Sequence, residues 1–142
     1  MFHLLINFRL NKVAISADVE KVFLQIALAE KVQDAVRFLF VENAQLNDLK
    51  LATYRFKRVN FGIKSSPFLL AATIKEHIRK YRDEQPDVFE ILNSCVYVDY
   101  FITGQDSIDE ALSLWRKAKQ IMSEANMNLH KLVSNDPELN GK

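Results

Sequence analysis

Two aspartates carry the side chains best suited to chemistry in this chain. Asp18 follows the apolar run 13–17, and Asp99 lies within Tyr97-Val98-Asp99-Tyr100, which reads as a tight strand-turn-strand. The two can act together only if a sheet pairs the strands that carry them. They could then hold two divalent ions roughly 3.5–4 Å apart, which activate an attacking hydroxyl and stabilise a leaving pyrophosphate. Taken singly, an aspartate at a strand end more often serves as a turn or cap residue.

The charge of the chain is divided along its length. Residues 50–82 contain nine basic residues and one acidic residue, whereas residues 83–110 contain eight acidic residues and no lysine or arginine. Two solvated faces that pair with each other would explain this division. A phosphate-binding surface beside an acidic metal site would explain it as well.

Length and composition indicate one globular domain or a piece of one. The chain has 142 residues, of which 49% are hydrophobic and 26% charged, which excludes a wholly disordered protein. The single cysteine, Cys95, cannot form an internal disulfide and favours an intracellular, cytoplasmic or nuclear, rather than a secreted protein. The apolar residues 1–9 are too short to span a bilayer and lack the features of a signal peptide, so we expect no membrane attachment.

Residue patterns in the first half predict alternating strands and helices. Residues 13–18 favour a strand, and a short helix can begin within residues 20–28. A strand over 36–41, a polar turn over 42–48 and a return strand through 54–56 predict a hairpin. A helix is expected from Ser65-Ser66-Pro67, with a serine hydroxyl as its cap and a buried stripe of Ala71, Ile74, Ile78 and Tyr81.

The second half predicts a second hairpin and a long helix. Pro86 falls in an acidic linker, and the hairpin arms are expected at 93–97 and 101–103. Ser107 and Glu110 match a capping box, which predicts a helix that ends near Asn126. A final strand over 129–133 and a frayed tail over 135–142 complete an α+β chain.

Three blocks of the sequence occur in a telling order: residues 16–26 (SADVEKVFLQI), residues 54–70 (YRFKRVNFGIKSSPFLL) and residues 97–100 (YVDY). Together they resemble the palm of a reverse transcriptase, and specifically that of BEL/Pao long-terminal-repeat retrotransposons. The resemblance implies an antiparallel sheet packed on helices over residues 1–134, with a partial fingers hairpin and no thumb. It also implies a fragment of a Pol polyprotein whose protease, RNase H and integrase segments are absent from this sequence.

The resemblance implies RNA-directed DNA synthesis on an RNA or DNA template-primer, with deoxynucleoside triphosphates and Mg²⁺ or Mn²⁺. Asp18 and Asp99 would be the catalytic metal ligands. Phe23 would exclude a ribose 2′-hydroxyl, or would simply be a core residue, and Gln25 would help form the nucleotide site. Phe61 and Gly62 would lie against the nucleotide, although Gly62 also suits an ordinary turn. The residues expected to contact nucleic acid are Arg55, Lys57, Arg58, Lys64, Ser65, Ser66 and Tyr97.

Three positions depart from the family pattern. The family usually has aspartate at the position of Tyr100, proline at Asn60 and glycine at Asn126. A tyrosine is neutral at pH 7 and cannot replace a carboxylate beside divalent ions. The sequence therefore predicts an impaired or inactive polymerase palm. The alternative is a non-catalytic retroelement remnant that at most binds nucleic acid through the basic residues 50–82.

Overall fold

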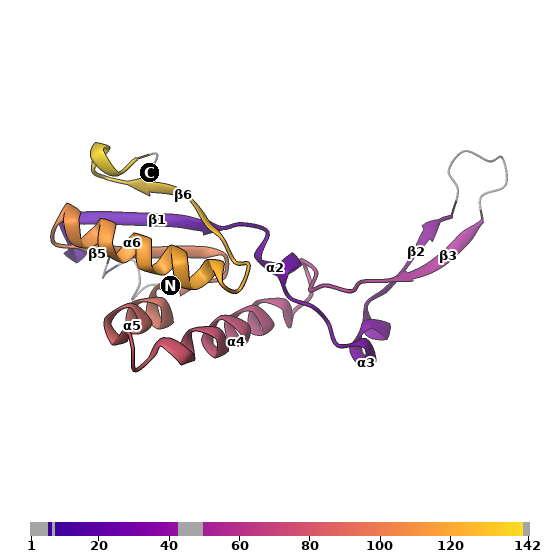
Figure 1. The fold of residues 1–142 in the computed structure, drawn as a ribbon. Coiled ribbons are helices and arrows are strands. Elements are labelled where there is room, and N and C mark those ends of the chain that lie inside the picture. Colours follow the sequence, from indigo (N-terminus) through magenta and orange to yellow (C-terminus); the bar gives the residue numbers. More distant parts are fainter. Residues whose placement is uncertain (1–5, 7, 43–49, 141–142) are drawn as a thin grey trace.

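The fold is built around a four-stranded antiparallel sheet. The computed structural model describes residue 6 and residues 8–42 and 50–140. Within them, the strand order is β4-β5-β1-β6. Its strands are β1 (Val13–Val19), β4 (Val96–Tyr97), β5 (Tyr100–Gln105) and β6 (Leu129–Ser134). The last two strands both pair with β1, so β1 lies in the interior of the sheet (Figure 1).

Three helices pack beside one another and cover the sheet. They are α4 (Ser66–Ile78), α5 (Pro86–Cys95) and α6 (Ile108–Ser123). Helix α6 contacts β1, β5 and β6, whereas α5 contacts β5 and both of the other helices (Figure 1). The predicted α+β class, with an antiparallel sheet packed on helices, is confirmed.

Strand β1 follows the period of two that its sequence predicts. Ile15, Ala17 and Val19 are buried, whereas Ser16 and Asp18 between them are half-buried. Successive side chains of a strand point to opposite faces, so one face of β1 enters the core and the other presents Asp18. Its face toward the helices joins one continuous hydrophobic core.

Helix α6 begins and ends as its sequence predicts. The Ser107 hydroxyl oxygen accepts a hydrogen bond from the Glu110 backbone N–H. At the other end Asn126 adopts φ 57°, and the Met127 N–H donates to the Met122 carbonyl at 3.0 Å. This is the Schellman arrangement, in which a left-handed residue ends the helix. Asparagine tolerates that conformation and fills the position where the family usually has glycine.

Helix α5 replaces the predicted acidic linker. Pro86 is its first residue, a position where the missing proline N–H has no helical partner. Val88, Leu92 and Cys95 recur at helical spacing and are buried against the core. Residues 93–95 are therefore helical, and the strand that was expected from residue 93 begins at Val96 instead.

Helix α4 differs in two details from its prediction. The Ser65 side chain makes no capping hydrogen bond; the Ser66 hydroxyl instead donates to the Asn60 carbonyl at 2.6 Å. Leu70 rather than Ala71 belongs to the buried stripe, because Ala71 is exposed. The other predicted members are buried, with Tyr81 in the following 3-10 turn η2 (Arg79–Tyr81).

The predicted first hairpin is present and projects away from the sheet. It consists of β2 (Arg37–Val41) and β3 (Leu51–Arg55) and follows the short helices α2 (Val22–Gln25), α3 (Glu30–Gln33) and η1 (Asp34–Val36) (Figure 1). Backbone bonds tie its base to the rest of the chain: Leu28 N–H to Lys57 O at 2.9 Å and Val59 N–H to Ile26 O at 3.0 Å. Most of the predicted turn at 42–48 lies outside the described residues.

The described part of the C-terminal tail, residues 135–140, packs against β6, whereas fraying was expected over 135–142. Residues Pro137–Leu139 form the 3-10 turn η3, and Leu139 is fully buried. The Ser134 N–H also donates to the Asn140 side-chain oxygen at 2.8 Å. One apolar side chain and the side-chain hydrogen bonds of Asn135 and Asn140 thus tie this segment to the sheet. None of the helices in the described parts of the chain is long and apolar enough to cross a membrane.

Candidate active site

The sheet places the backbone segments that carry the two predicted catalytic aspartates side by side. Asp18 is the register partner of Tyr100 across β1 and β5, and the Val19 N–H donates to the Asp99 carbonyl at 2.7 Å. Directly opposed residues of antiparallel strands share a face, so the side chains of Asp18 and Tyr100 lie on the same face of the sheet. The pairing that joint action of Asp18 and Asp99 requires is therefore present.

The aspartate hairpin turns on only two residues. Tyr97 pairs with Tyr100, and Val98 between them has φ 56°. A β-branched residue in the left-handed region is an outlier that costs about 1–2 kcal/mol. Strain of this kind persists where the surrounding structure enforces it, often at functional sites.

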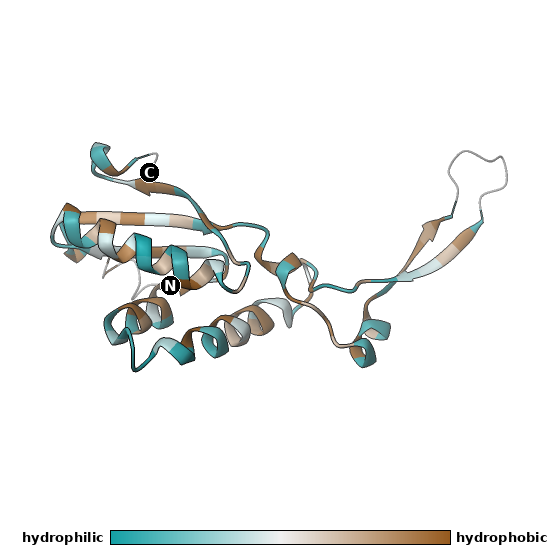
Figure 2. Ribbon diagram, in the orientation of Figure 1, coloured by the Kyte–Doolittle hydropathy of each residue, from teal (hydrophilic) through white to brown (hydrophobic). Residues whose placement is uncertain are grey.

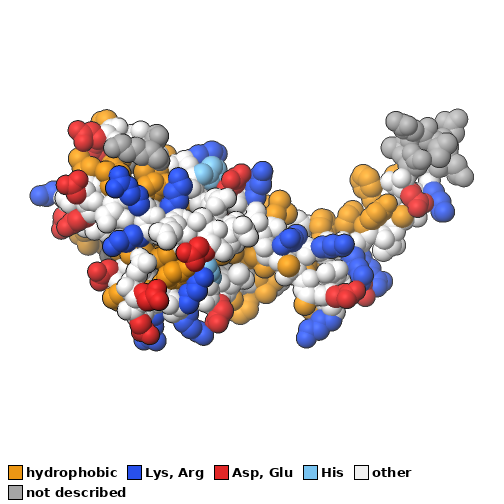
Figure 3. Space-filling view, viewed as in Figure 1, with side chains coloured by type: hydrophobic (Ala, Val, Ile, Leu, Met, Phe, Trp, Pro, Cys, Tyr) orange, Lys and Arg blue, Asp and Glu red, His pale blue; other side chains and the backbone are white. Residues whose placement is uncertain are grey.

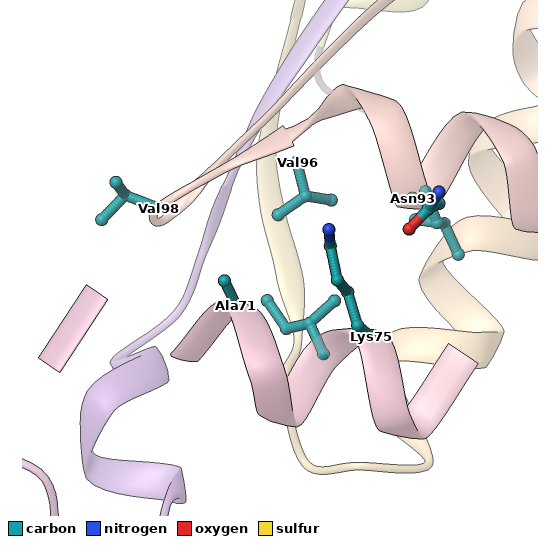
Figure 4. A pocket seen from close by; sticks show the side chains of 7 residues that line it. Ala71, Lys75, Asn93, Val96 and Val98 are labelled. Atoms are coloured by element: carbon teal, nitrogen blue, oxygen red, sulfur yellow. The ribbon is translucent and has the colours of Figure 1, made fainter. Parts of the chain in front are cut away.

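Helix α4 packs beside the aspartate hairpin. Val96 and Val98 face Ala71 and Lys75 of α4 across a small cavity of about 40 Å³. In Figure 4 the Lys75 side chain rises from α4 and directs its amine toward Val96. A basic side chain thus lies beside β4, the strand that leads into the turn carrying Asp99.

Tyr100 stands where the family usually has a second hairpin carboxylate. It is 47% exposed, so its phenol is open to solvent on the face that Asp18 shares. Among the residues that the structure describes, no three His, Cys, Asp or Glu side chains form a group that could hold a metal ion.

Two residues of β6 complete the surroundings of Asp18, and the sequence analysis missed both. Lys131 Nζ lies 3.9 Å from Asp18 Oδ2, and His130 Nδ1–H donates to the Asp18 carbonyl at 3.2 Å. The β1–β6 register shifts between Ser16 and Asp18, and Lys131 adopts φ 53°. No sequence pattern marks such an irregularity, so only the structure could reveal this ion pair.

Phe23 and Phe61, both predicted at the nucleotide site, pack against each other. Their ring centroids are 4.6 Å apart at an interplanar angle of 64°. Phe23 is only 3% exposed, whereas Phe61 is 61% exposed. Phe61 thus offers an open ring, and Phe23 supports it from the core. Gln25 is half-buried, and its carbonyl accepts a hydrogen bond from Arg58 at 3.1 Å.

The loop that carries Gly62 depends on backbone conformation. Gly62 has φ 82°, and a Cβ added there would meet no atom within 4 Å. Glycine is therefore favoured by the positive φ and not by close contact within the chain. Asn60, where the family usually has proline, accepts a hydrogen bond from the Phe61 N–H through Oδ1 at 2.9 Å. The asparagine side chain thus orders the start of this loop.

The basic side chains predicted to contact nucleic acid are in different environments. Arg55 pairs with Asp34 at 3.2 Å and with Glu30 at 3.6 Å. Hydrogen bonding from Arg37, and then from Arg55, lowers the pKa of Asp34. In the described residues the exposed Lys57 and Lys64 have no ion pair.

The other predicted contact residues differ in exposure. Tyr97 and Ser65 are exposed, but Ser66 is 2% exposed and uses its hydroxyl within the loop. Across the described part of the chain, no ion pair joins the basic residues 50–82 to the acidic residues 83–110. The two segments therefore do not neutralise each other through direct contacts.

Comparison with known proteins identifies the family. The chain has no match among curated proteins. The family model described as reverse transcriptase (RNA-dependent DNA polymerase) matches residues 3–132, which is most of the chain. Its match spans both aspartates, the loop around Gly62 and strand β6 as far as Leu132. The chain therefore belongs to the reverse transcriptase (RNA-dependent DNA polymerase) family.

Proposed function

We propose that this chain is a reverse transcriptase palm whose nucleotidyl transfer is impaired. Members of the family act on a nucleic-acid template-primer and nucleotides, and they generally use divalent metal ions. The observation that carries the proposal is the register of β1 and β5, which sets Tyr100 directly opposite Asp18. A neutral phenol thus occupies the place from which a carboxylate would face the first catalytic aspartate.

The charges around Asp18 support the same conclusion. A phenol offers one oxygen and no negative charge at neutral pH, so it contributes little to holding a divalent cation. Lys131 meanwhile places a positive charge 3.9 Å from the Asp18 carboxylate. Both features lower the attraction of this face for a cation.

The remaining parts of the palm keep the arrangement that substrate binding would use. Phe61 presents an exposed ring beside the Gly62 turn, and Tyr97 is exposed at the aspartate hairpin. In this proposal the loop around Gly62 lies against the nucleotide and Tyr97 against the primer end. The three quoted sequence blocks further support an origin in a BEL/Pao-type retrotransposon Pol polyprotein.

Nucleic-acid binding without catalysis is the second candidate function. It is favoured by the basic segment 50–82, whose charge is not neutralised by ion pairs to residues 83–110. Lys57, Lys64 and Lys75 are exposed and would be available to phosphates. Binding of this kind releases counterions, so the affinity should fall steeply as salt rises.

Primer extension on an RNA template tests the proposed impairment. The unaltered chain, Tyr100→Asp and Tyr100→Phe would be compared with Mg²⁺ and with Mn²⁺. We expect Tyr100→Asp to raise extension by roughly 10- to 100-fold, the scale of changes around metal sites. Tyr100→Phe is the matched control, because it alters the same side chain without adding a carboxylate, and it should give no gain.

Asp18→Ala shows whether any extension comes from this site. In the Tyr100→Asp background it should abolish extension. Efficient extension by the unaltered chain that Asp18→Ala abolishes would prove the proposed impairment wrong.

Fluorescence anisotropy with a labelled single-stranded RNA tests the second candidate. Replacing Lys57 and Lys64 together by glutamine should weaken binding and reduce the slope of log K against log salt by roughly 0.7 for each phosphate that is no longer neutralised. Lys117→Gln, which removes an exposed lysine of α6, is the control. Undetectable or salt-insensitive binding would rule this function out.

A further inference from the structure

One face of the β2–β3 hairpin is aromatic. Phe38 is the register partner of Tyr54, and Phe40 follows two residues along on the same face of β2. The opposite face carries Leu39 and Leu51. Because side chains alternate along a strand, the rings gather on one side of the hairpin.

These rings contact one another in a continuous row. Phe38 stacks on Tyr54 with centroids 5.8 Å apart, and on Phe56 with centroids 4.6 Å apart. Phe40 meets Tyr54 edge-on at 6.4 Å. We call Phe38, Phe40, Tyr54 and Phe56 the aromatic ladder.

Three rings of the aromatic ladder are open to solvent, and Phe56 is half-buried. Phe38 is 36% exposed, Tyr54 42% and Phe40 63%. Figures 2 and 3 show hydrophobic residues along the projecting hairpin, far from the core of the sheet. Apolar patches of this kind commonly mark a binding surface.

An apolar groove continues from the base of the hairpin toward the active-site loop. It has a volume of about 580 Å³, and its walls include Val36, Val59 and the 72% exposed Phe68. Asn60 and Ile63 of the Gly62 loop line its other end. The groove therefore connects the hairpin with the loop that we place against the nucleotide.

The charge around the aromatic ladder determines which occupant it fits. Residues 26–64 contain seven lysines and arginines against four acidic residues. Figure 3 shows basic side chains gathered at the base of the hairpin. Arg37 and Arg55 lie on the opposite face and pair with Asp34, whereas the exposed Lys57 and Arg58, which follow Phe56, have no ion pair among the described residues. A second copy of the chain would bring a hairpin of the same net positive charge, whereas a nucleic acid would bring phosphates to these cations.

We propose that the aromatic ladder is a stacking platform for the unpaired bases of single-stranded nucleic acid. Open rings beside cations bind single strands by stacking bases while the cations follow the phosphates. Duplex bases are already stacked on each other, so the platform should discriminate against paired strands. The inference rests on the proposed binding of nucleic acid. It adds a site made of residues that the family resemblance did not assign to nucleic-acid contact. Two of them, Phe38 and Phe40, also lie outside the basic segment 50–82.

The test compares two double variants of the full chain. Phe40→Leu with Tyr54→Leu removes two rings but keeps apolar side chains. Leu39→Ala with Leu51→Ala removes exposed apolar side chains from the opposite face and serves as the matched control. Anisotropy would be measured with a single-stranded RNA 12-mer and with a duplex of the same length, and sedimentation would report self-association.

We expect the ring variant to bind the single strand at least roughly tenfold more weakly, since loss of one stacked base is worth about 1–3 kcal/mol. Duplex affinity and the control variant should stay unchanged. Equal single-strand binding by the ring variant and the unaltered chain would overturn the platform, while salt-sensitive binding by the unaltered chain would leave the proposed function standing. Self-association that only the ring variant loses, with RNA affinity unchanged, would instead assign the face to a second copy. No RNA binding by the unaltered chain would overturn the platform and the proposed binding of nucleic acid together.

Discussion

The palm sheet and the β2–β3 hairpin are both made of strand-forming sequence, yet they are stabilised differently. In the sheet, Ile15 of β1 and Phe101 of β5 are at most 1% exposed and belong to one core under the helices. In the hairpin, every residue of β2 except the half-buried Val41 is exposed. A two-stranded hairpin is at best marginally stable alone, so this one depends on its base and on whatever covers its faces. Strand propensity specifies the hydrogen-bonded pair, and burial provides the stability.

The largest effect should come from truncating the same residue type in the two regions. Phe101→Ala empties the centre of the palm core and should cost about 3–5 kcal/mol of unfolding free energy. Phe40→Ala removes an exposed ring and should change stability by less than about 0.5 kcal/mol. Urea unfolding followed by circular dichroism measures both. A large loss for Phe40→Ala would show that its ring is buried in solution, and the contrast between the regions would then fail.

The difference between the regions also explains which elements could be read from the sequence. Helix α6 was predicted well because its cap residues, its apolar stripe and Asn126 all agree. Helix α5 was missed because Pro86 was interpreted as a break, although proline also suits the first position of a helix. The tail was expected to fray because it is mostly polar, whereas the buried Leu139 and the side-chain hydrogen bonds of Asn135 and Asn140 hold it in place. Local patterns identify elements with several agreeing signals and fail where tertiary contact decides.

The second effect concerns the loop between the two regions. Gly62→Ala should cost about 1–2 kcal/mol, because alanine is disfavoured at φ 82° even with open space around its Cβ. Gly62→Asn is the matched control, since asparagine tolerates left-handed conformations better and should cost less. Thermal unfolding of both variants measures the difference. If Gly62→Ala and Gly62→Asn are both as stable as the unaltered chain, the loop changes conformation without cost and does not need this glycine.

The candidate site was predictable only as far as its motifs extend. The resemblance identified Asp18, Asp99 and the Gly62 loop, and in the structure the strands that carry the two aspartates pair through their backbones. Lys131 was not identified, because its approach to Asp18 depends on a register shift and a positive φ. Neither was the aromatic ladder, because a run of strand-forming residues does not reveal that its faces are uncovered. Spacing shows which residues are present, whereas irregular backbone and missing cover appear only in three dimensions.

The third effect is a pH dependence of stability that arises in the palm alone. Glu124, at the end of α6, accepts hydrogen bonds from Tyr81 and Lys80, which follow α4. The Tyr81 hydroxyl, and then the Lys80 amine, lower the pKa of Glu124. Its folded pKa lies below its usual value of 4.5, so the stability it contributes is present above that pH and is lost as pH falls through the folded pKa.

Unfolding temperatures between pH 6 and about pH 3 test this contribution. The unaltered chain should lose stability more steeply on acidification than Glu124→Gln, and the two curves should converge at the acid end. Glu138→Gln, in the exposed part of η3, is a control that should follow the unaltered chain. Parallel curves for Glu124→Gln and the unaltered chain would show that this carboxylate does not join the two helices in solution.

The smallest effect should arise at the base of the hairpin and stay there. Asp34→Asn removes the ion pairs to Arg37 and Arg55, all of which are solvent-exposed and therefore weak. We expect the unfolding temperature of the palm to stay unchanged while amide hydrogen exchange quickens in β2 and β3. The pKa of Asp34 is lowered, so its carboxylate becomes protonated only as pH falls below the usual range of that group. The unaltered chain should then approach the exchange pattern of Asp34→Asn, after intrinsic exchange rates are corrected for pH. Glu76→Gln, which breaks an exposed pair between α4 and Arg79 of η2, should leave exchange in the hairpin unaltered. A drop in the unfolding temperature with Asp34→Asn would mean that the hairpin and the sheet unfold as one unit. The weak ion pairs of Asp34, and not the core alone, would then help to stabilise the palm.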